Sequence, residues 1–240
     1  MEIKLFTTKN NISGGGVGFS FIGNVELKKQ SVIKGTTTGP KQEISFFIND
    51  NEYVNPVSDE SRYFEIVFDK DKPLRSICTS PNLDDYGEEL SMEIKTLDLS
   101  HFDTSQINDM HNMFNRCGLI TELDISHFDT SKVTNMSGMF DNCYGLTSLD
   151  LSNFDTSKVK SMQAMFYRCM HLTSLDLSNW NLSNITDEYS RMKMFEMCDL
   201  LKTIKINDEA SANKLIVQIK DDLNKTATWN TETKIITIPA

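Results

Sequence analysis

The chain has 240 residues, of which 39% are hydrophobic and 24% are charged, and its 34 acidic and 24 basic side chains give a formal net charge of −10. This acidity argues against nucleic acid and anionic membranes as partners, since both require a basic face. The chain contains no run of 18 apolar residues, so no transmembrane helix is expected. Residues 1–8 lack the charged-then-apolar layout of a signal peptide.

Residues 1–90 contain short alternating or apolar runs that are separated by Gly, Asn and Asp. These runs are Glu2–Phe6, Val17–Ile22, Glu43–Ile48 and Tyr63–Phe68. Alternation bounded by turn residues is typical of β-strands. The sequence therefore predicts a small β-sandwich-like module, placed so that it caps the segment that follows.

A 26-residue repeat occupies the middle of the chain. The tetrapeptide Leu97–Ser100 (Leu-Asp-Leu-Ser) returns, with one Leu-to-Ile change, at Leu123, Leu149 and Leu175, each time 26 residues later. A Phe-Asp-Thr-Ser segment, a Met-Phe pair and a Cys follow it in the same register, and only the last step to Cys198 is lengthened, to 29 residues. A fifth unit opens at residues 201–206. Ten of the 12 Met lie between residues 110 and 197, so the excess of Met is a property of the repeat.

Each unit is predicted to form a strand, a turn and a short helix. In the unit 146–169, Leu149 and Leu151 point to one side of a strand, and Asp150 points to the other, toward solvent. The segment Asp155–Ser157 supplies N-cap oxygens, and the apolar spacing over 159–169 has a helical period. One unit cannot bury its apolar face alone, so the units are expected to stack into a solenoid. The period lies within the range of about 20–29 residues of leucine-rich repeats.

Stacking would align equivalent side chains into buried ladders. The predicted ladder positions are Phe102, Phe128, Phe154 and Trp180; Phe114, Phe140, Phe166 and Phe195; and Cys117, Cys143, Cys169 and Cys198. Zinc sites usually need closely spaced Cys pairs, which are absent from this ladder. Rung spacing of about 5 Å falls within the disulfide range. Parallel side chains at a core position nevertheless favour buried free thiols.

The opposite side of the strands forms the candidate binding surface. Its predicted residues are Asp98, Asp124, Asp150, Asp176, Ser100, Ser126, Ser152, Ser178, His101, His127, Asn153 and Asn179. The four Asp have repeated environments, whereas general acid–base catalysis needs two carboxyl groups with different pKa values. A solvated face, a partner surface or a weak cation site remain open alternatives.

No metal site, cofactor or enzyme is predicted. His101 and His127 stand one repeat apart, beside Asp103 and Asp129, and two His with two Asp can bind a divalent metal. Later repeats carry Asn in the same register, however, which favours a position that simply accepts polar residues. No nucleophile with a base partner is recognisable.

Residues 208–240 are predicted to cap the last repeat. A helical face contains Ala210, Leu215, Ile216, Ile219 and Leu223, and a strand follows around Ile235, Ile236 and Ile238. Such a strand at a sheet edge could also pair with another chain.

The unit 146–169 resembles the repeat of BspA-type leucine-rich repeat surface proteins, which occur in gut and oral bacteria, mycoplasmas and some parasitic protists. The resemblance covers roughly residues 95–207 and is most specific in the Met-Phe-x-x-Cys ending. It implies a non-enzymatic recognition or adhesion protein that presents its repeats to a protein or glycan on a host or neighbouring surface.

The sequence thus predicts a mixed α and β chain with three parts: a β-sandwich-like module or cap (1–90), a short leucine-rich repeat solenoid of four to five units (91–207) and a helix–strand C-terminal cap (208–240). Its expected role is recognition at a bacterial or virion surface, without nucleic acid binding or membrane insertion. The alternative is a structural or decoration subunit of an assembly such as a phage virion. The expected location is extracellular or at the cell surface if a leader has been trimmed, and otherwise on a virion.

Overall fold

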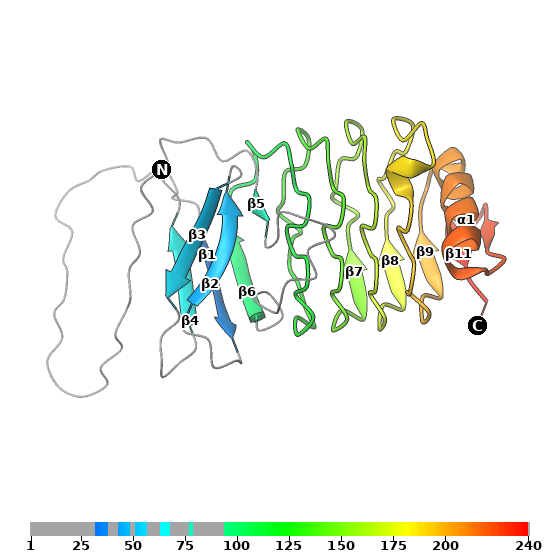
Figure 1. Ribbon diagram of the computed structural model, residues 1–240. Coiled ribbons are helices and arrows are strands. Elements are labelled where there is room, and N and C mark those ends of the chain that lie inside the picture. The colour runs from blue at the N-terminus through cyan, green and yellow to red at the C-terminus, as the bar shows by residue number, and fades with distance from the viewer. Residues whose placement is uncertain are drawn as a thin grey trace, which may run out of the picture.

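The computed structural model describes residues 32–37, 43–48, 51–56, 63–67, 77–78 and 94–239. Within these ranges the chain forms mainly short strands and turns, with one α-helix near the C-terminus (Figure 1). The predicted mixture of α and β structure is confirmed at this level. No helix among the described residues has the length and apolar character needed to cross a membrane.

The strands before the repeats belong to two antiparallel sheets. In one, β1 (Val32–Thr37) lies between β4 (Tyr63–Val67) and β6 (Ile94–His101); in the other, β2 (Glu43–Ile48) lies between β3 (Asn51–Pro56) and β5 (Ile77–Cys78). Strands β2 and β4 confirm two predicted strands. Strands β1 and β3 escaped prediction because they contain Gly, Asn and Pro, which disfavour strands. The predicted strands Glu2–Phe6 and Val17–Ile22 lie outside the described residues.

The strand of the first repeat does not join the strands of the later repeats. It forms β6, which pairs antiparallel with β1 so that Asp98 lies opposite Lys34. Ile33 of β1 is buried in the same apolar core as Ile94 and Leu99 of β6. The first repeat and the strands before it therefore share one sheet and one core across the predicted boundary at residue 90.

The later repeats lie side by side in sequence order (Figure 1). Strands β7 (Ser148–Asp150), β8 (Ser174–Asp176) and β9 (Thr203–Lys205) pair in parallel, with Leu149 opposite Leu175 and Leu175 opposite Ile204. The sheet continues antiparallel through β11 (Ile235–Thr237) to β10 (Thr228–Asn230). The 26-residue period is therefore the length of chain between neighbouring parallel strands.

The short helix predicted in each repeat is wrong: the segments 110–117, 136–143 and 162–169 form successive tight turns. Their N–H groups alternate between two kinds of acceptor. Met113 donates to the Met110 carbonyl of its own repeat at 3.3 Å, whereas Phe114 donates to the Met139 carbonyl of the next repeat at 2.9 Å. A helix would direct every donor to its own chain segment, whereas here the neighbouring repeat takes every second one.

Left-handed residues maintain this alternation. Each repeat has two of them, four residues apart, such as Asn112 with φ 53° and Arg116 with φ 62°. The equivalent pairs are Gly138 and Asn142, Ala164 and Arg168, and Lys193 and Met197. An α-helix needs right-handed backbone throughout, so these residues exclude it. The apolar spacing was interpreted as helical because repeated turns bury side chains at similar intervals.

Stacked aromatic rings fill the core between the strands and the turns. Phe140 is fully buried, with ring centroids 5.6 Å from Phe114 and 5.7 Å from Phe166. In the second aromatic ladder, the Phe128 ring lies 6.4 Å from that of Phe154. Trp180 replaces Phe in the next repeat, and its indole N–H donates to the Leu151 carbonyl at 3.1 Å. Nearly parallel rings one repeat apart give a continuous apolar core.

Helix α1 (Glu209–Leu223) covers the last repeat. Its N-cap residue Asp208 accepts the Ser211 N–H at 2.7 Å, and it ends at Asn224 in the left-handed region. Leu215 and Ile219 are buried as predicted, but Ala212 rather than Ala210 faces the core. The predicted C-terminal helix and the strand β11 are thus confirmed, and β10 is an additional strand.

Side chains of α1 replace the backbone of an absent further repeat. The Phe166 N–H donates to a carbonyl of the following repeat, but the equivalent Phe195 N–H donates to the Asp222 carboxylate at 2.7 Å. The Lys214 ammonium likewise donates to the Leu182 carbonyl at 2.7 Å. The helix therefore satisfies donors and acceptors that an uncapped stack would leave without protein partners.

Candidate functional site

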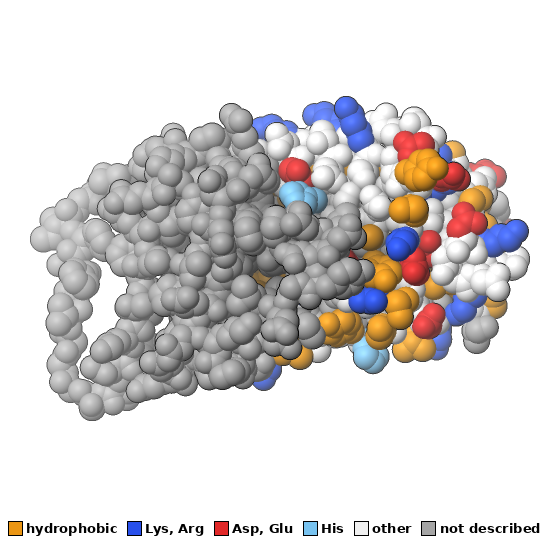
Figure 2. All heavy atoms as spheres, viewed as in Figure 1, with side chains coloured by type: hydrophobic (Ala, Val, Ile, Leu, Met, Phe, Trp, Pro, Cys, Tyr) orange, Lys and Arg blue, Asp and Glu red, His pale blue; other side chains and the backbone are white. Residues whose placement is uncertain are grey.

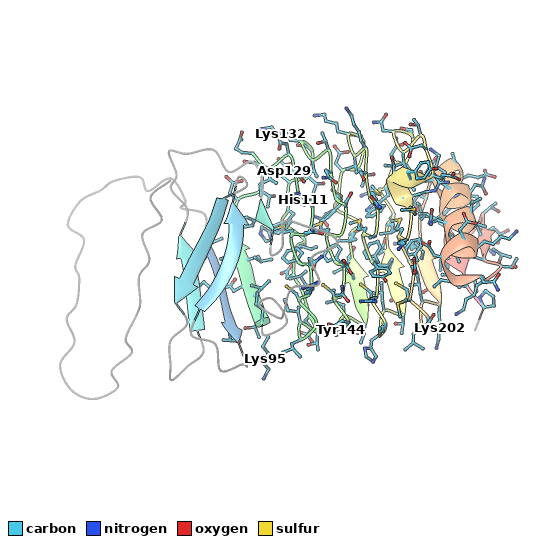
Figure 3. The ribbon with its side chains drawn as sticks, in the orientation of Figure 1. Lys95, His111, Asp129, Lys132, Tyr144 and Lys202 are labelled. Atoms are coloured by element: carbon cyan, nitrogen blue, oxygen red, sulfur yellow. The ribbon has the colours of Figure 1, made fainter. Side chains whose placement is uncertain are left out.

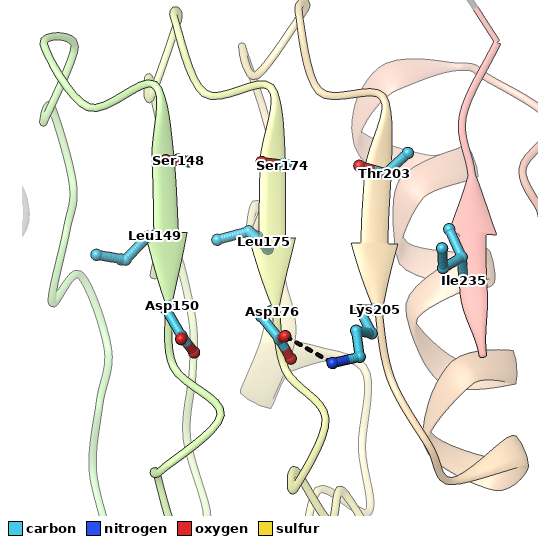
Figure 4. A pocket seen from close by; sticks show the side chains of 9 residues that line it. All are labelled: Ser148, Leu149, Asp150, Ser174, Leu175, Asp176, Thr203, Lys205 and Ile235. Carbon is cyan, nitrogen blue, oxygen red and sulfur yellow. Dashed lines mark hydrogen bonds and ion pairs between the residues drawn. The ribbon is translucent and has the colours of Figure 1, made fainter. Parts of the chain in front are cut away.

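The exposed face of the five-stranded sheet carries two rows of side chains. Strand residues two apart point to the same side, so each strand contributes one residue to each row. One row contains Ser148, Ser174 and Thr203, and the other contains Asp150, Asp176 and Lys205 (Figure 4). A shallow groove of about 300 Å³ lies on this face, and Ile235 of β11 completes its lining.

The predicted row of four aspartates is divided between different parts of the fold. Asp150 and Asp176 are direct register partners in β7 and β8. Asp98 instead lies in β6, opposite Lys34, and Asp124 lies in a segment with no assigned strand. The structure thus brings together two of the four predicted carboxylates in one groove.

Each of these aspartates stabilises a local turn. Asp124 Oδ1 accepts the N–H of Ser126 at 3.1 Å and its hydroxyl at 2.7 Å. The same bond from the serine N–H reaches Asp98 at 3.0 Å, Asp150 at 2.9 Å and Asp176 at 3.0 Å. The bonds from Ser126 hold the pKa of Asp124 below its usual range. The Asp-x-Ser spacing is therefore also a structural motif, which sequence reasoning had treated only as a surface.

The predicted His and Asn positions contact the preceding repeat or its own neighbours. The Asn153 amide donates to the Ile125 carbonyl at 3.1 Å, and the Asn179 amide donates to the Ser152 carbonyl. The His127 ring packs edge-on against Phe128, with centroids 5.2 Å apart. His101 is exposed at the end of β6. Among the described residues no group of three or more His, Cys, Asp or Glu is arranged to hold a metal ion.

Lys205 ends the acidic row of the groove. It is the register partner of Asp176, and its ammonium lies 3.0 Å from the Asp176 carboxylate. Its place could have been deduced from the sequence, because the fifth unit aligns Ile204-Lys205-Ile206 with Leu175-Asp176-Leu177. The row Ser148, Ser174 and Thr203 was missed although it repeats with the same offset.

The remaining described surface carries no comparable regular row. Asp129 and Lys132 lie at one edge of the stack, and Tyr144 and Lys202 lie at the opposite edge (Figure 3). On the face seen in Figure 2, the described acidic, basic and apolar side chains are intermixed. The sheet face is therefore the most ordered polar surface among the described residues.

The predicted Cys ladder lies in the core as free thiols. Cys143 Sγ donates to the Phe114 carbonyl at 3.0 Å, and Cys169 Sγ donates to the Phe140 carbonyl at 3.1 Å. Burial raises the pKa of Cys117 to about 12. Since the thiolate is the reactive form, these thiols are chemically protected.

We expect Cys117, Cys143, Cys169 and Cys198 of the native chain to resist alkylation by iodoacetamide at pH 8. All four should react once urea unfolds the chain. Peptide mapping by mass spectrometry measures the labelling at each position, and the urea sample is the matched control. Fast labelling of any of the four in the native chain would contradict their burial.

One carboxyl group is buried within the turns. Asp141 is 4% exposed and accepts hydrogen bonds from the amides of Asn115 at 3.2 Å and Asn142 at 2.7 Å. Burial raises the pKa of Asp141 from 3.8 to about 7, although the guanidinium groups of Arg168 and Arg116 act in the opposite direction. Its ionised form is therefore unfavourable in the folded chain.

The Asp141→Asn variant should change the pH dependence of stability. The raised pKa means that the folded state holds this proton more tightly, so the stabilisation present below pH 3.8 is lost as the pH rises through about 7. The free energy of unfolding of the variant should thus rise relative to wild type between pH 5 and 7, by at most about 1.4 kcal/mol per pH unit. Urea unfolding at several pH values measures this difference, and a constant difference would contradict the prediction.

These features define a repeat protein whose units contribute a buried ladder and an exposed polar row. The chain belongs to the family described as Mycoplasma protein of unknown function, DUF285, whose sequence model matches residues 86–207, just over half of its length. The match spans the four complete repeats. Comparison with curated proteins finds no match, and comparison with solved structures finds none either.

Proposed function

We propose that the chain is a non-enzymatic recognition protein of the BspA-type leucine-rich repeat class. In this proposal the stacked units form a short solenoid between a β-sandwich-like module and the C-terminal cap, and they present the sheet face to a protein or glycan on another surface. The family match and the parallel pairing of β7, β8 and β9 support it. Extended faces of this kind are the usual binding surfaces of repeat proteins.

The observation that carries the proposal is the groove on the sheet face. It combines carboxylate, ammonium and hydroxyl groups at regular spacing, and its register follows directly from the repeat. Asp150 is exposed and, unlike Asp176, has no cation beside it among the described residues. A polar face that the core does not use is available for a partner.

The test measures binding of the fluorescently labelled full chain to cultured animal cells and to immobilised extracellular-matrix proteins. The double variant Asp124→Lys with Asp150→Lys should bind at least tenfold more weakly, because it reverses two charges on the face. The matched variant Asp124→Asn with Asp150→Asn keeps an acceptor for the serine N–H and separates the effect of charge from that of the turn. Lys132→Glu, at the edge of the stack, should bind as wild type. Equal binding by all variants would contradict the proposal.

A structural subunit of an assembly is the second candidate, and it rests on one observation. Strand β10 is an outer strand of the five-stranded sheet and pairs with β11 alone among the described strands. Such an edge can accept a strand of another chain. Light scattering of the purified full chain would show oligomers that Trp229→Pro in β10 abolishes; a monomer at all concentrations would argue against self-assembly through this edge.

A further inference from the structure

A row of hydroxyl groups crosses the whole five-stranded sheet. Its members are direct register partners on neighbouring strands: Ser148, Ser174, Thr203, Thr237 and Thr228. Register partners point to the same face of a sheet, and all five side chains are exposed or partly exposed. The last two come from the C-terminal cap, so the row extends beyond the repeats.

These hydroxyl groups make no hydrogen bond to any other described part of the chain. Other hydroxyl groups of the repeats do: Ser126 bonds Asp124, and Thr130 bonds the backbone of Asp155. A hydroxyl that donates and accepts nothing within the fold remains available to a ligand. The five-membered row is therefore not explained by the needs of the fold.

The second row lies parallel to the first, two residues further along each strand. It contains Asp150, Asp176, Lys205 and Ile235, and the groove lies on the face that the two rows share (Figure 4). Strand geometry places the rows about 7 Å apart and gives the groove a length of about 14 Å from β7 to β11. Leu149 and Leu175 direct their side chains into the core, so the backbone forms the floor.

We propose that this groove binds a neutral, linear glycan whose sugar rings lie across β7, β8, β9 and β11, one ring on each strand. The proposal rests on the proposed function and names the ligand class of the same face. A pyranose ring linked through opposite ends advances a chain by about one strand spacing, which is about 4.8 Å. Its hydroxyl groups project from both margins of the ring, toward the hydroxyl row on one side and toward the charged row on the other.

The charges in the groove select against an anionic polymer. The Lys205 ammonium is paired with Asp176 at 3.0 Å, so Asp150 leaves the groove with an excess of negative charge. A protein partner is also disfavoured, because a protein interface needs apolar anchors. The groove offers one exposed apolar side chain, Ile235, since Leu149 and Leu175 are buried. A neutral ligand rich in hydroxyl groups matches the donors and acceptors that remain.

Isothermal titration of the full chain with β-1,4-linked hexasaccharides of glucose and of N-acetylglucosamine tests the proposal. At least one of them should bind, and more tightly than its disaccharide, because more strands are engaged. An oligogalacturonate of equal length should bind at least tenfold more weakly than the neutral sugar. The variant Ser174→Ala with Thr203→Ala should weaken binding by about fivefold per hydroxyl. Ser131→Ala with Ser157→Ala, which removes two hydroxyl groups outside the groove, should bind as wild type.

A second variant, Ser174→Trp, fills the groove and should abolish sugar binding, and urea unfolding shows whether each variant is folded. Failure of both neutral hexasaccharides to bind at millimolar concentration, or wild-type affinity in the folded groove variants, would overturn the glycan. If the charge-reversal variants nevertheless lose binding to cells or matrix proteins, the recognition function stands and its ligand is a protein. If they bind normally there, both proposals fail.

Discussion

The Phe140→Ala variant is expected to lose about 3–5 kcal/mol of unfolding free energy. The Phe140 ring is fully buried and stacks between Phe114 and Phe166, with centroid distances of 5.6 and 5.7 Å. Its removal opens a cavity that both neighbouring repeats line. The rings cannot shift to fill it, because the backbone bonds between repeats hold each ring in its own rung.

Urea unfolding followed by circular dichroism measures the effect of this change. Phe140→Leu keeps most of the apolar volume and should lose less than half as much stability. Leu119→Ala removes a side chain that is 44% exposed and should stay within about 0.5 kcal/mol of wild type. A loss below 1 kcal/mol for Phe140→Ala would show that the aromatic ladder is not a main source of stability.

The Thr130→Val variant is expected to lose about 2–4 kcal/mol. The Thr130 side chain is buried, and its hydroxyl accepts the Asp155 N–H at 2.8 Å and donates to the Asp155 carbonyl at 3.1 Å. Thr104 and Thr156 make the same pair of bonds to the next repeat. Val has nearly the same shape, so the variant removes both bonds without creating a cavity.

Thr130→Ser is the matched control, since it keeps the hydroxyl and removes only a methyl group. It should retain most of the stability that Thr130→Val loses. Ser157→Ala removes an exposed hydroxyl from the neighbouring repeat and should leave the unfolding free energy nearly unchanged. Equal stability of Thr130→Val and wild type would mean that water replaces both bonds.

The Asp-Thr-Ser segment shows how far the sequence could be interpreted correctly. Its polar residues predicted a capped backbone, and Asp155 does accept the Ser157 N–H at 2.9 Å. The capped element is a turn instead of a helix, and the threonine serves the next repeat instead of its own. A local pattern identifies which groups form bonds close in sequence, but not which bonds reach a neighbour 25 residues away.

The sequence by itself determined the repeat, its 26-residue period, the side chains that are buried and the C-terminal helix and strand. These follow from periodicity, because copies of one apolar pattern can be buried only against each other. The Phe and Cys ladders needed no further information. The position of Lys205 beside Asp176 was also within reach, since the fifth unit keeps the register of the fourth.

Only the tertiary structure decided where the backbone hydrogen bonds go and which strands become neighbours. Burial with a period near that of a helix is compatible with turns as soon as another repeat offers acceptors. The strand of the first repeat pairs with β1, which removes Asp98 from the predicted row, and the hydroxyl row is completed by two threonines of the C-terminal cap. Side-chain patterns report burial, whereas pairing depends on which backbone edges remain free once the chain has folded.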